Sequence, residues 1–354
     1  MQGFDPSALR QAYFETQEGE PRMRAIRSAI TQAEQAKDDY ARLIFHRDFI
    51  KESVFSGDRY QALIDFPQYL AIYDANPELH PQFRYHVLWT FKWILQAAAE
   101  FPQIEKSQVL RWFSHFRSEL SKAGYSLKPF YNLRAAFYSY YDYAKFLLDY
   151  EDFQNAKADE MSDGDPDTYD AIVQYELLRG NDAAALKTAN LIFERNYRTD
   201  EVPAKTYSYL LRYAMLRHDM ETAAHYAELL RPFCIRKRFR MTELGLLLCF
   251  DAKTNPCAAY QLLSEHEEMR RSSRNPYLCF WFDRGAMMVY DALANRQISV
   301  PLDNGQIFTP EDAARLAEEN IFCVLSNLSY FNCRNFTVVI HIIDNCTDKN
   351  FKSG

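Results

Sequence analysis

Four short polar breaks in this 354-residue chain share one pattern, which limits the available folds more than any other feature. In each break, a turn residue stands five positions before an alanine. The four pairs are Gly57 and Ala62, Glu151 and Ala156, Gly180 and Ala185, and His218 and Ala223. Between the breaks, apolar residues recur at three- and four-residue intervals over blocks of about 12 to 18 residues. The pattern predicts helices joined in pairs by short turns.

The spacing has a physical reason. Glycine adopts the left-handed conformation that ends a helix at little cost. The small alanine then lets the second helix approach the first closely. Gly180 and His218 stand roughly 38 residues apart, and a weaker copy of the break follows at Thr254, with Ala259 five positions later. The interval from Gly180 to His218 and the interval of 36 residues from His218 to Thr254 are both near the period of about 34 residues that is typical of stacked helical hairpins.

These breaks resemble the tetratricopeptide repeat (TPR), in which a Gly-Asp-aromatic turn ends the first helix and an alanine opens the second. Tyr169 and Tyr207 stand eleven positions before their turns, where the family places a large aromatic residue. The resemblance covers roughly residues 40 to 295 and is strongest from 167 to 231. It implies an all-α fold, a right-handed α-solenoid of about six or seven TPR-like helix pairs with N- and C-terminal capping helices. No unit carries the full family consensus, so an analogous hairpin array is the alternative.

Three segments are predicted: N-terminal capping helices over 1–37, the TPR-like array over 38–295, and a C-terminal loop with capping helices over 296–354. Within the array, apolar blocks predict helices over 83–99, 108–120 and 131–148. The unit that starts at Glu151 is short, so its second helix should end before Asp163. Residues 305–308 are expected to form a loop, and Thr309 followed by Pro310 predicts a helix start. That helix should run to about Ser326. For residues 336–343, a helix is favoured over a strand.

Composition excludes several other classes of protein. Only 10 glycines are present, and long alternation of apolar and polar residues is absent, which argues against a sandwich, a barrel or a glycine-looped nucleotide fold. The longest apolar run, at 244–250, is far shorter than the roughly 20 residues of a bilayer span, so a cytoplasmic protein without membrane partners is expected. The seven cysteines include no C-x2-C pair. Reduced thiols are therefore expected, with no metal site and no cofactor.

In the family that the breaks resemble, the first helix of each pair lines a concave groove. Counting back from the turns places eight residues there: Arg47, Lys51, Tyr138, Tyr141, Lys145, Lys205, Ser208 and Arg212. The rings near Tyr138 follow one another too closely for all of them to face a core. Such a lining suits an extended protein or peptide segment that is acidic or ends in a free carboxylate. The alternative is ordinary packing between repeats and a solvated charged face.

A second basic set lies in the links that follow the second helices of three successive units. It consists of Arg195, Arg198, Arg236, Lys237, Arg238, Arg240, Arg270, Arg271 and Arg274. Equivalent links of a solenoid fall on one edge, so this basic rim could meet phosphates or an acidic protein surface. Cations also favour helix C-termini through the helix dipole, which explains some of them without a function. The net charge of −7 argues against nucleic acid as the main partner.

The leading hypothesis is a protein- or peptide-binding scaffold or regulator that uses the concave groove without catalysis. The alternative is a structural assembly, inhibitor or adaptor protein acting through its outer surface or as a homodimer. Exposed aromatic residues such as Phe331 and Phe336 would support that alternative. The sequence has no motif for catalysis: the stretch 265–268 has one histidine without H-E-x-x-H spacing. A calcium loop is not expected either, because the glycine in the acidic run 163–170 is in the wrong position for one.

Overall fold

The structure is a computed structural model that describes residues 4–56, 58–140, 142–235 and 237–332. Within these ranges it contains sixteen α-helices, two short 3-10 turns and one two-stranded hairpin, so the predicted all-α class is confirmed. The chain divides into two compact units. Unit 1 holds the described residues up to Tyr138 together with Ala144–Ser162, and unit 2 holds Ser139–Tyr143 and the described residues from Asp163 onward.

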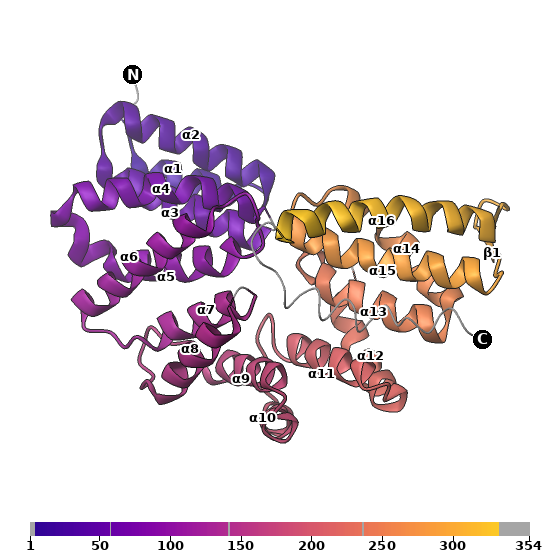
Figure 1. The fold of residues 1–354 in the computed structure, drawn as a ribbon. Coiled ribbons are helices and arrows are strands. Elements are labelled where there is room, and N and C mark those ends of the chain that lie inside the picture. Colours follow the sequence, from indigo (N-terminus) through magenta and orange to yellow (C-terminus); the bar gives the residue numbers. More distant parts are fainter. Residues whose placement is uncertain (1–3, 57, 141, 236, 333–354) are drawn as a thin grey trace. The chain divides into compact units, whose positions relative to one another are not determined.

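Most of unit 1 consists of helices that pack against their neighbours in the sequence (Figure 1). Its helices are α1 (Pro6–Glu15), α2 (Glu20–Ala36), α3 (Asp39–Ser56), α4 (Arg59–Ala75), α5 (His80–Ala98), α6 (Lys106–Ala123), α7 (Lys128–Ser139) and α8 (Tyr143–Asn155), with a 3-10 turn at Pro77–Leu79. The helices α3 and α4 form one antiparallel pair, α5 and α6 the next, and α3 also contacts α5. The helices predicted over 83–99 and 108–120 are thus confirmed as α5 and α6.

Unit 2 repeats this arrangement with successive helix pairs. Its helices are α9 (Asp165–Arg179), α10 (Asp182–Glu194), α11 (Ala204–Leu216), α12 (Met220–Cys234), α13 (Met241–Thr254), α14 (Pro256–Arg271), α15 (Pro276–Asn295) and α16 (Pro310–Asn332), with a 3-10 turn at Arg238–Arg240. The strands β1 (Val300–Pro301) and β2 (Ile307–Phe308) pair antiparallel before α16. Each first helix also contacts the first helix of the next pair, in the order α9, α11, α13 and α15.

The turn-and-alanine pattern locates real helix pairs. Gly180 ends α9 with a φ of 73°, and His218, which replaces the glycine after α11, adopts the same left-handed region with a φ of 57°. The alanines five positions after the turns predicted at 57, 180, 218 and 254 are all fully buried: Ala62, Ala185, Ala223 and Ala259. A larger side chain at these places would push the paired helices apart, because protein interiors are close-packed.

The predicted turn at Glu151 is wrong. Residues 151–155 belong to α8, which begins at Tyr143, and the preceding helix α7 ends at Ser139. Phe146, Tyr150 and Phe153 are buried at spacings of four and three, so the apolar stripe crosses the expected break and favours a continuous helix. The helix predicted over 131–148 is therefore divided between α7 and α8, and the shortened second helix expected before residue 163 is replaced by non-helical chain over 156–164.

The C-terminal part was predicted partly correctly. Thr309 and Asp312 exchange hydrogen bonds between their side chains and backbone N–H groups at 3.1 and 3.2 Å, which caps the start of α16. The expected loop at 305–308 instead includes strand β2, and α16 extends beyond Ser326 to Asn332. The prediction for 336–343 falls outside the described residues. None of the described helices has an apolar stretch long enough to cross a membrane.

Two glycines allow α13 and α15 to cross at very close range in unit 2. A Cβ atom at Gly285 would lie 2.6 Å from the carbonyl oxygen of Gly245, and one at Gly245 would overlap the carbonyl of Trp281. No side chain can be accommodated at such a crossing without moving backbone. The crossing therefore fixes the part of α15 that carries Trp281.

Candidate functional site

Helix α11 has two chemically different faces. Tyr207, Leu210 and Leu211 are buried in the cores that unit 2 forms around α11. Lys205, Tyr209 and Arg212, spaced four and three residues apart, are only partly buried and share the other face. We call these three residues the α11 face.

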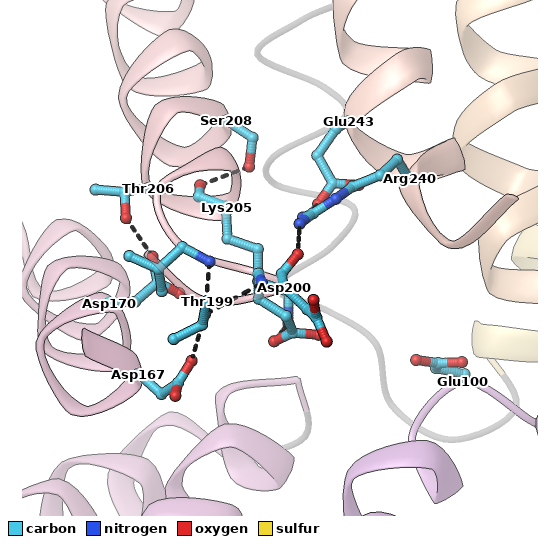
Figure 2. A network of polar contacts seen from close by, with 12 residues as sticks. Glu100, Asp167, Asp170, Thr199, Asp200, Lys205, Thr206, Ser208, Arg240 and Glu243 are labelled. Atoms are coloured by element: carbon cyan, nitrogen blue, oxygen red, sulfur yellow. Dashed lines mark hydrogen bonds and ion pairs between the residues drawn. The ribbon is translucent and has the colours of Figure 1, made fainter. Parts of the chain in front are cut away.

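Polar contacts gather at the Lys205 end of the α11 face (Figure 2). The Lys205 ammonium group pairs with the carboxylate of Glu201. Next to it, the Thr206 hydroxyl donates a hydrogen bond of 2.5 Å to Asp170 of α9. The Ser208 hydroxyl donates to the backbone carbonyl of Lys205 at 2.7 Å, so Ser208 is used within the helix. This end of the face is therefore built from α9, α11 and the loop before α11.

Residues at the start of α13 also take part in this network. The Arg240 guanidinium donates a hydrogen bond of 3.1 Å to Glu243 and another to the backbone carbonyl of Asp200 (Figure 2). In the same loop, the Thr199 hydroxyl donates to Asp167 of α9 at 3.2 Å. These contacts hold the loop that leads into α11 between α9 and α13.

Burial and neighbouring charges shift the pKa values of the titratable groups at the Lys205 end of the α11 face. Asp170 is 6 % exposed, and burial raises its pKa to about 7, although the Thr206 hydrogen bond and the Lys205 charge oppose the rise. Burial acts to lower the pKa of Lys205, but Glu201 and Asp170 outweigh it and the pKa is raised. Burial raises the pKa of Tyr209 well above its ordinary value. At neutral pH, Lys205 is therefore a fixed cation, whereas Asp170 is close to its titration point.

The acids of this network do not form a metal site. Among the described residues, no three His, Cys, Asp or Glu side chains are arranged to hold a metal ion. The network instead combines ion pairs with hydroxyl groups that donate hydrogen bonds within the fold.

The other end of the α11 face is aromatic and basic. The guanidinium carbon of Arg212 lies 5.5 Å from the centre of the Trp281 ring, and that of Arg284 lies at the same distance from it. The Tyr277 ring is 6.3 Å from Trp281 and 6.5 Å from Tyr140. Helix α15 thus brings an indole and a second arginine next to α11.

Trp281 is 7 % exposed, and its indole N–H is buried without a hydrogen-bond partner. Burial raises the pKa of Tyr277 well above its ordinary value, while Trp281 and Arg212 act in the opposite direction. The indole N–H lies next to the Tyr277 hydroxyl and lowers its pKa by hydrogen bonding, although the pair falls short of good hydrogen-bond geometry.

The remaining predicted groove residues lie on other helices. Arg47 of α3 donates two hydrogen bonds to the adjacent Asp48, at 3.0 and 2.7 Å, and Lys51 is exposed. Tyr138 of α7 is buried, and the Lys145 ammonium group of α8 lies 5.3 Å from its ring centre. Tyr138 and Lys145 thus meet across two helices instead of sharing the one helix that the turn at 151 predicted. Tyr141 lies outside the described residues.

The predicted basic rim is only partly at the surface. Arg240 is buried, and Arg270 donates two hydrogen bonds, at 2.5 and 2.6 Å, to Asp283. Arg271 is exposed and pairs with Glu267. The other exposed members are Arg195, Arg198, Lys237 and Arg274. Arg236 and the side chain of Arg238 lie outside the described residues. Arg240 and Arg270 therefore serve contacts within the fold, because the buried charges of Arg240 and Asp283 must be paired.

Sequence reasoning missed several residues of this site: Asp170, Tyr209, Trp281 and Arg284. Tyr209 could have been found from the helical spacing between Lys205 and Arg212. Asp170 lies in the acidic run 163–170, which was considered only as a calcium loop and was therefore not included in the groove. Trp281 and Arg284 lie in an apolar block that carries no local signal, so only packing shows where they point.

Comparisons with known proteins give no family for this chain. No protein-family model matches it, and no curated protein matches it. The site must therefore be interpreted from its own geometry.

Proposed function

We propose that this chain is a helical-repeat binding protein that holds an extended peptide segment on the α11 face of unit 2, without catalysis. The sequential packing of helix pairs supports a TPR-like, right-handed α-solenoid as its architecture. In such arrays the first helices of successive pairs present the ligand-binding side chains.

One observation carries this proposal. Four successive first helices of unit 2 contribute functional groups along the α11 face. These groups are Asp170 of α9, Lys205 and Arg212 of α11, Glu243 of α13 and Trp281 of α15. A surface assembled from four separate helices, with fixed charges at one end and an aromatic-basic cluster at the other, has the composition that peptide recognition uses.

The dimensions suit a short segment. Lys205 and Arg212 are seven residues apart on one helix, which corresponds to about 10 Å along the axis. An extended chain covers about 3.3 Å per residue, so roughly three residues of a ligand would span the face. We therefore expect three or four ligand residues to make the main contacts.

The titrating groups support binding rather than catalysis. Lys205 stays protonated at neutral pH, so its ammonium group cannot accept a proton as a general base. Burial raises the pKa of the Cys279 thiol, so this thiol is a poor nucleophile. Asp170 titrates near neutrality, but it is buried and hydrogen-bonded to Thr206.

A retention experiment tests the proposal. A pool of random tetrapeptides is passed over immobilised wild-type protein, and the retained peptides are quantified by mass spectrometry. We expect Lys205→Met and Arg212→Gln each to reduce retention by about tenfold, in line with the loss of a charged contact. Lys187→Met, which removes an exposed lysine from α10, is the matched control and should leave retention unchanged. Equal retention by all four proteins would exclude the α11 face as the binding site.

A second candidate function, association through the outer surface, rests on exposed apolar side chains in unit 1. Phe14, Phe55 and Ile64 are 46 %, 61 % and 47 % exposed. Exposed large apolar side chains are common at protein interfaces. Phe336 and the side chain of Phe331, which the sequence had suggested for this role, lie outside the described residues. Light scattering over a dilution series should show a stable dimer if this candidate holds, and a monomer throughout would reject it.

A further inference from the structure

We propose that unit 1 carries a binding face of its own, which takes an acidic protein segment with large apolar side chains. The face lies on α1, α3 and α5, the first helices of the three successive pairs of unit 1. We call it the unit 1 face. Its main residues are Arg10 of α1, Arg47, Lys51 and Phe55 of α3, and Tyr85 and Trp93 of α5. The inference goes beyond the α11 face, because it uses other helices in the other unit.

Exposed rings are concentrated on these first helices. Phe14 of α1, Tyr40 and Phe55 of α3, and Tyr85 of α5 are all exposed. The second helices α2, α4 and α6 contribute a single large exposed apolar side chain, Ile64. Covering such rings is favourable, because it removes apolar surface from water. The uneven distribution therefore indicates that a partner covers the first helices.

The side chains of α3 form one continuous row. At intervals of seven, four and four residues, the row runs through Tyr40, Arg47, Lys51 and Phe55. Residues at these intervals share one side of a helix. Rings at both ends of the row contact rings of α5, and the Phe55 ring centre lies 5.6 Å from that of Trp93. The row and the neighbouring residues of α5 are therefore parts of one surface.

The α1 and α3 part of this surface is cationic. Arg10 donates a hydrogen bond to one carboxylate oxygen of Asp48, and Arg47 donates to the other. Asp48 is buried, so a single internal carboxylate serves both guanidinium groups. Lys51 is exposed, and no carboxylate in the described part of the chain pairs with it. Three cations and one carboxylate leave a surplus of two positive charges.

The rows on α3 and α5 contain no acidic side chain. Helix α5 has no Asp or Glu at all, and Arg42 and Arg22 neutralise the other acids of α3, Asp39 and Glu52. The whole chain, in contrast, has 48 acidic and 41 basic residues. A local surface without acids on an acidic protein favours a negatively charged partner.

The α5 part of the surface is apolar and uncharged, which favours a protein segment over a nucleic acid. Lys92 of α5 is buried and donates to the Met161 carbonyl, and Arg84 lies 3.7 Å from Glu119. Burial and then the charge of Arg47 lower the pKa of His86, which is therefore neutral at pH 7. Evenly spaced phosphates would match only the cationic part. A segment with acidic side chains on one side and apolar side chains on the other matches both parts.

The length of the row sets the length of the segment. From Tyr40 to Phe55 the helix rises by about 22 Å. An extended chain covers about 3.3 Å per residue, so roughly seven residues of a ligand would follow the row. Side chains of an extended chain alternate between two sides, so alternating acidic and apolar residues present one kind to each part of the face.

The test measures fluorescence anisotropy of four labelled probes with the full chain. The first probe is a ten-residue peptide that alternates glutamate and leucine. The second has glutamine for glutamate, the third has serine for leucine, and the fourth is a ten-residue oligouridylate. We expect the glutamate–leucine peptide to bind at least tenfold more tightly than each of the others. Equal binding of the glutamine or serine peptide would overturn the proposal, and oligouridylate as the tightest probe would assign the face to single-stranded nucleic acid instead.

Two variants locate the binding. Lys51→Glu places a like charge against the acidic probe and should weaken binding at least tenfold, whereas the matched Lys187→Glu on α10 should not. Phe55→Ser removes an exposed ring and should weaken binding about fivefold. Leu148→Ser, which removes a similarly exposed apolar side chain from α8, is its control. All four positions are exposed, and circular dichroism checks that each variant is folded. Loss of binding in the controls alone would contradict the assignment.

The outcomes separate this face from the α11 face. Lys205→Met should leave binding of the glutamate–leucine peptide unchanged. If Lys205→Met weakens it and Lys51→Glu does not, the probe binds the α11 face, and the unit 1 proposal fails while the proposed function stands. If tetrapeptides are not retained but Lys51→Glu still weakens the probe, the reverse holds. A wild-type dimer that Phe55→Ser converts to a monomer would show that a second copy covers the rings, which would also overturn the proposal.

Discussion

Two buried aspartates, one in each unit, show how differently the same side chain is used in this protein. Asp48 of unit 1 is 5 % exposed and Asp170 of unit 2 is 6 % exposed. Burial acts to raise the pKa of both. For Asp48, the Arg10 hydrogen bond and the charge of Arg47 outweigh burial, and the pKa ends below its ordinary value. For Asp170, burial prevails and the pKa is raised to about 7.

The difference lies in the partners and not in the depth of burial. Asp48 accepts hydrogen bonds of 2.7 Å from both Arg10 and Tyr13, and two more from Arg47. Asp170 accepts a hydrogen bond from the neutral Thr206 hydroxyl. Removing a carboxylate that arginines compensate leaves their charges unpaired and destabilises the fold, whereas a poorly compensated carboxylate is itself destabilising and is more typical of a functional site. The comparison therefore marks Asp170, of the two aspartates, as the one to examine for function.

The largest expected effect is at Asp48. Asp48→Asn removes the negative charge that Arg10 and Arg47 share and should lower the free energy of unfolding by about 3 kcal/mol at pH 7. Chemical denaturation followed by circular dichroism measures this. Because the pKa of Asp48 is lowered, its contribution is complete above the ordinary aspartate value and is lost as the pH falls through the folded-state pKa. An unchanged unfolding midpoint would mean that Asp48 is not the compensated group described above.

Asp170 should behave in the opposite way. Its raised pKa means that the folded state binds the proton more tightly than the unfolded chain, so its contribution to stability falls as the pH rises from about 4 to about 7. Asp170→Asn cannot ionise and should exceed wild type by on the order of 2 kcal/mol above pH 7, with little difference near pH 4. Denaturation curves across this range provide the measurement. The exposed Asp303→Asn is the control. A variant that is less stable than wild type at pH 8 would contradict the assignment.

A smaller effect is expected from Arg47→Met, which removes one of the two arginines at Asp48. Arg10 and Tyr13 remain, so the loss should be about 1 kcal/mol, well below that of Asp48→Asn. Arg24→Met interrupts an exposed pair with Glu20 at 3.4 Å and should have no measurable effect, since surface ion pairs contribute little. If both variants unfold at the wild-type midpoint, Arg47 does not compensate Asp48.

The smallest expected effect is on the Asp170 titration itself. The Lys205 charge opposes the rise in the Asp170 pKa, so Lys205→Met should move the Asp170 midpoint upward, by less than one pH unit. Carboxyl 13C chemical shifts followed between pH 5 and 9 would measure it. A midpoint that stays in place or moves down would show that Lys205 does not act on Asp170.

Most of the helices could be predicted from the sequence, and the reason is local. The turn residue and the alanine five positions later are short-range requirements, so the sequence located the turns between α9 and α10, between α11 and α12, and between α13 and α14. The left-handed conformation of His218 was seen only in the structure. The same logic failed at Glu151, where a similar string of residues occurs inside the continuous apolar stripe of α8. Two acidic residues do not stop a helix whose buried face continues through them.

The candidate site was only half predictable. Lys205 and Arg212 were placed on the groove by counting back from the turn at His218, as the resemblance to the tetratricopeptide repeat implies. Trp281, Arg284 and Asp170 come from helices that are distant in the sequence, and nothing in their neighbourhood shows which helix they meet. The ion pairs that Arg240 and Arg270 form within the fold were likewise invisible, because packing decides which carboxylates they meet.

The sequence by itself determined the all-α class, the turns at Gly180 and His218, and the placement of Lys205 and Arg212 on one helix. These follow from helix periodicity, from backbone conformations that few residues adopt, and from the need of close helices for small side chains. Only the tertiary structure showed that the glycines of α13 and α15 meet and fix Trp281 near Arg212. It also showed that Asp170 accepts a hydrogen bond from a threonine, whereas Asp48 accepts hydrogen bonds from two arginines. Partners and desolvation are properties of the assembled fold, so no local stretch of sequence contains them.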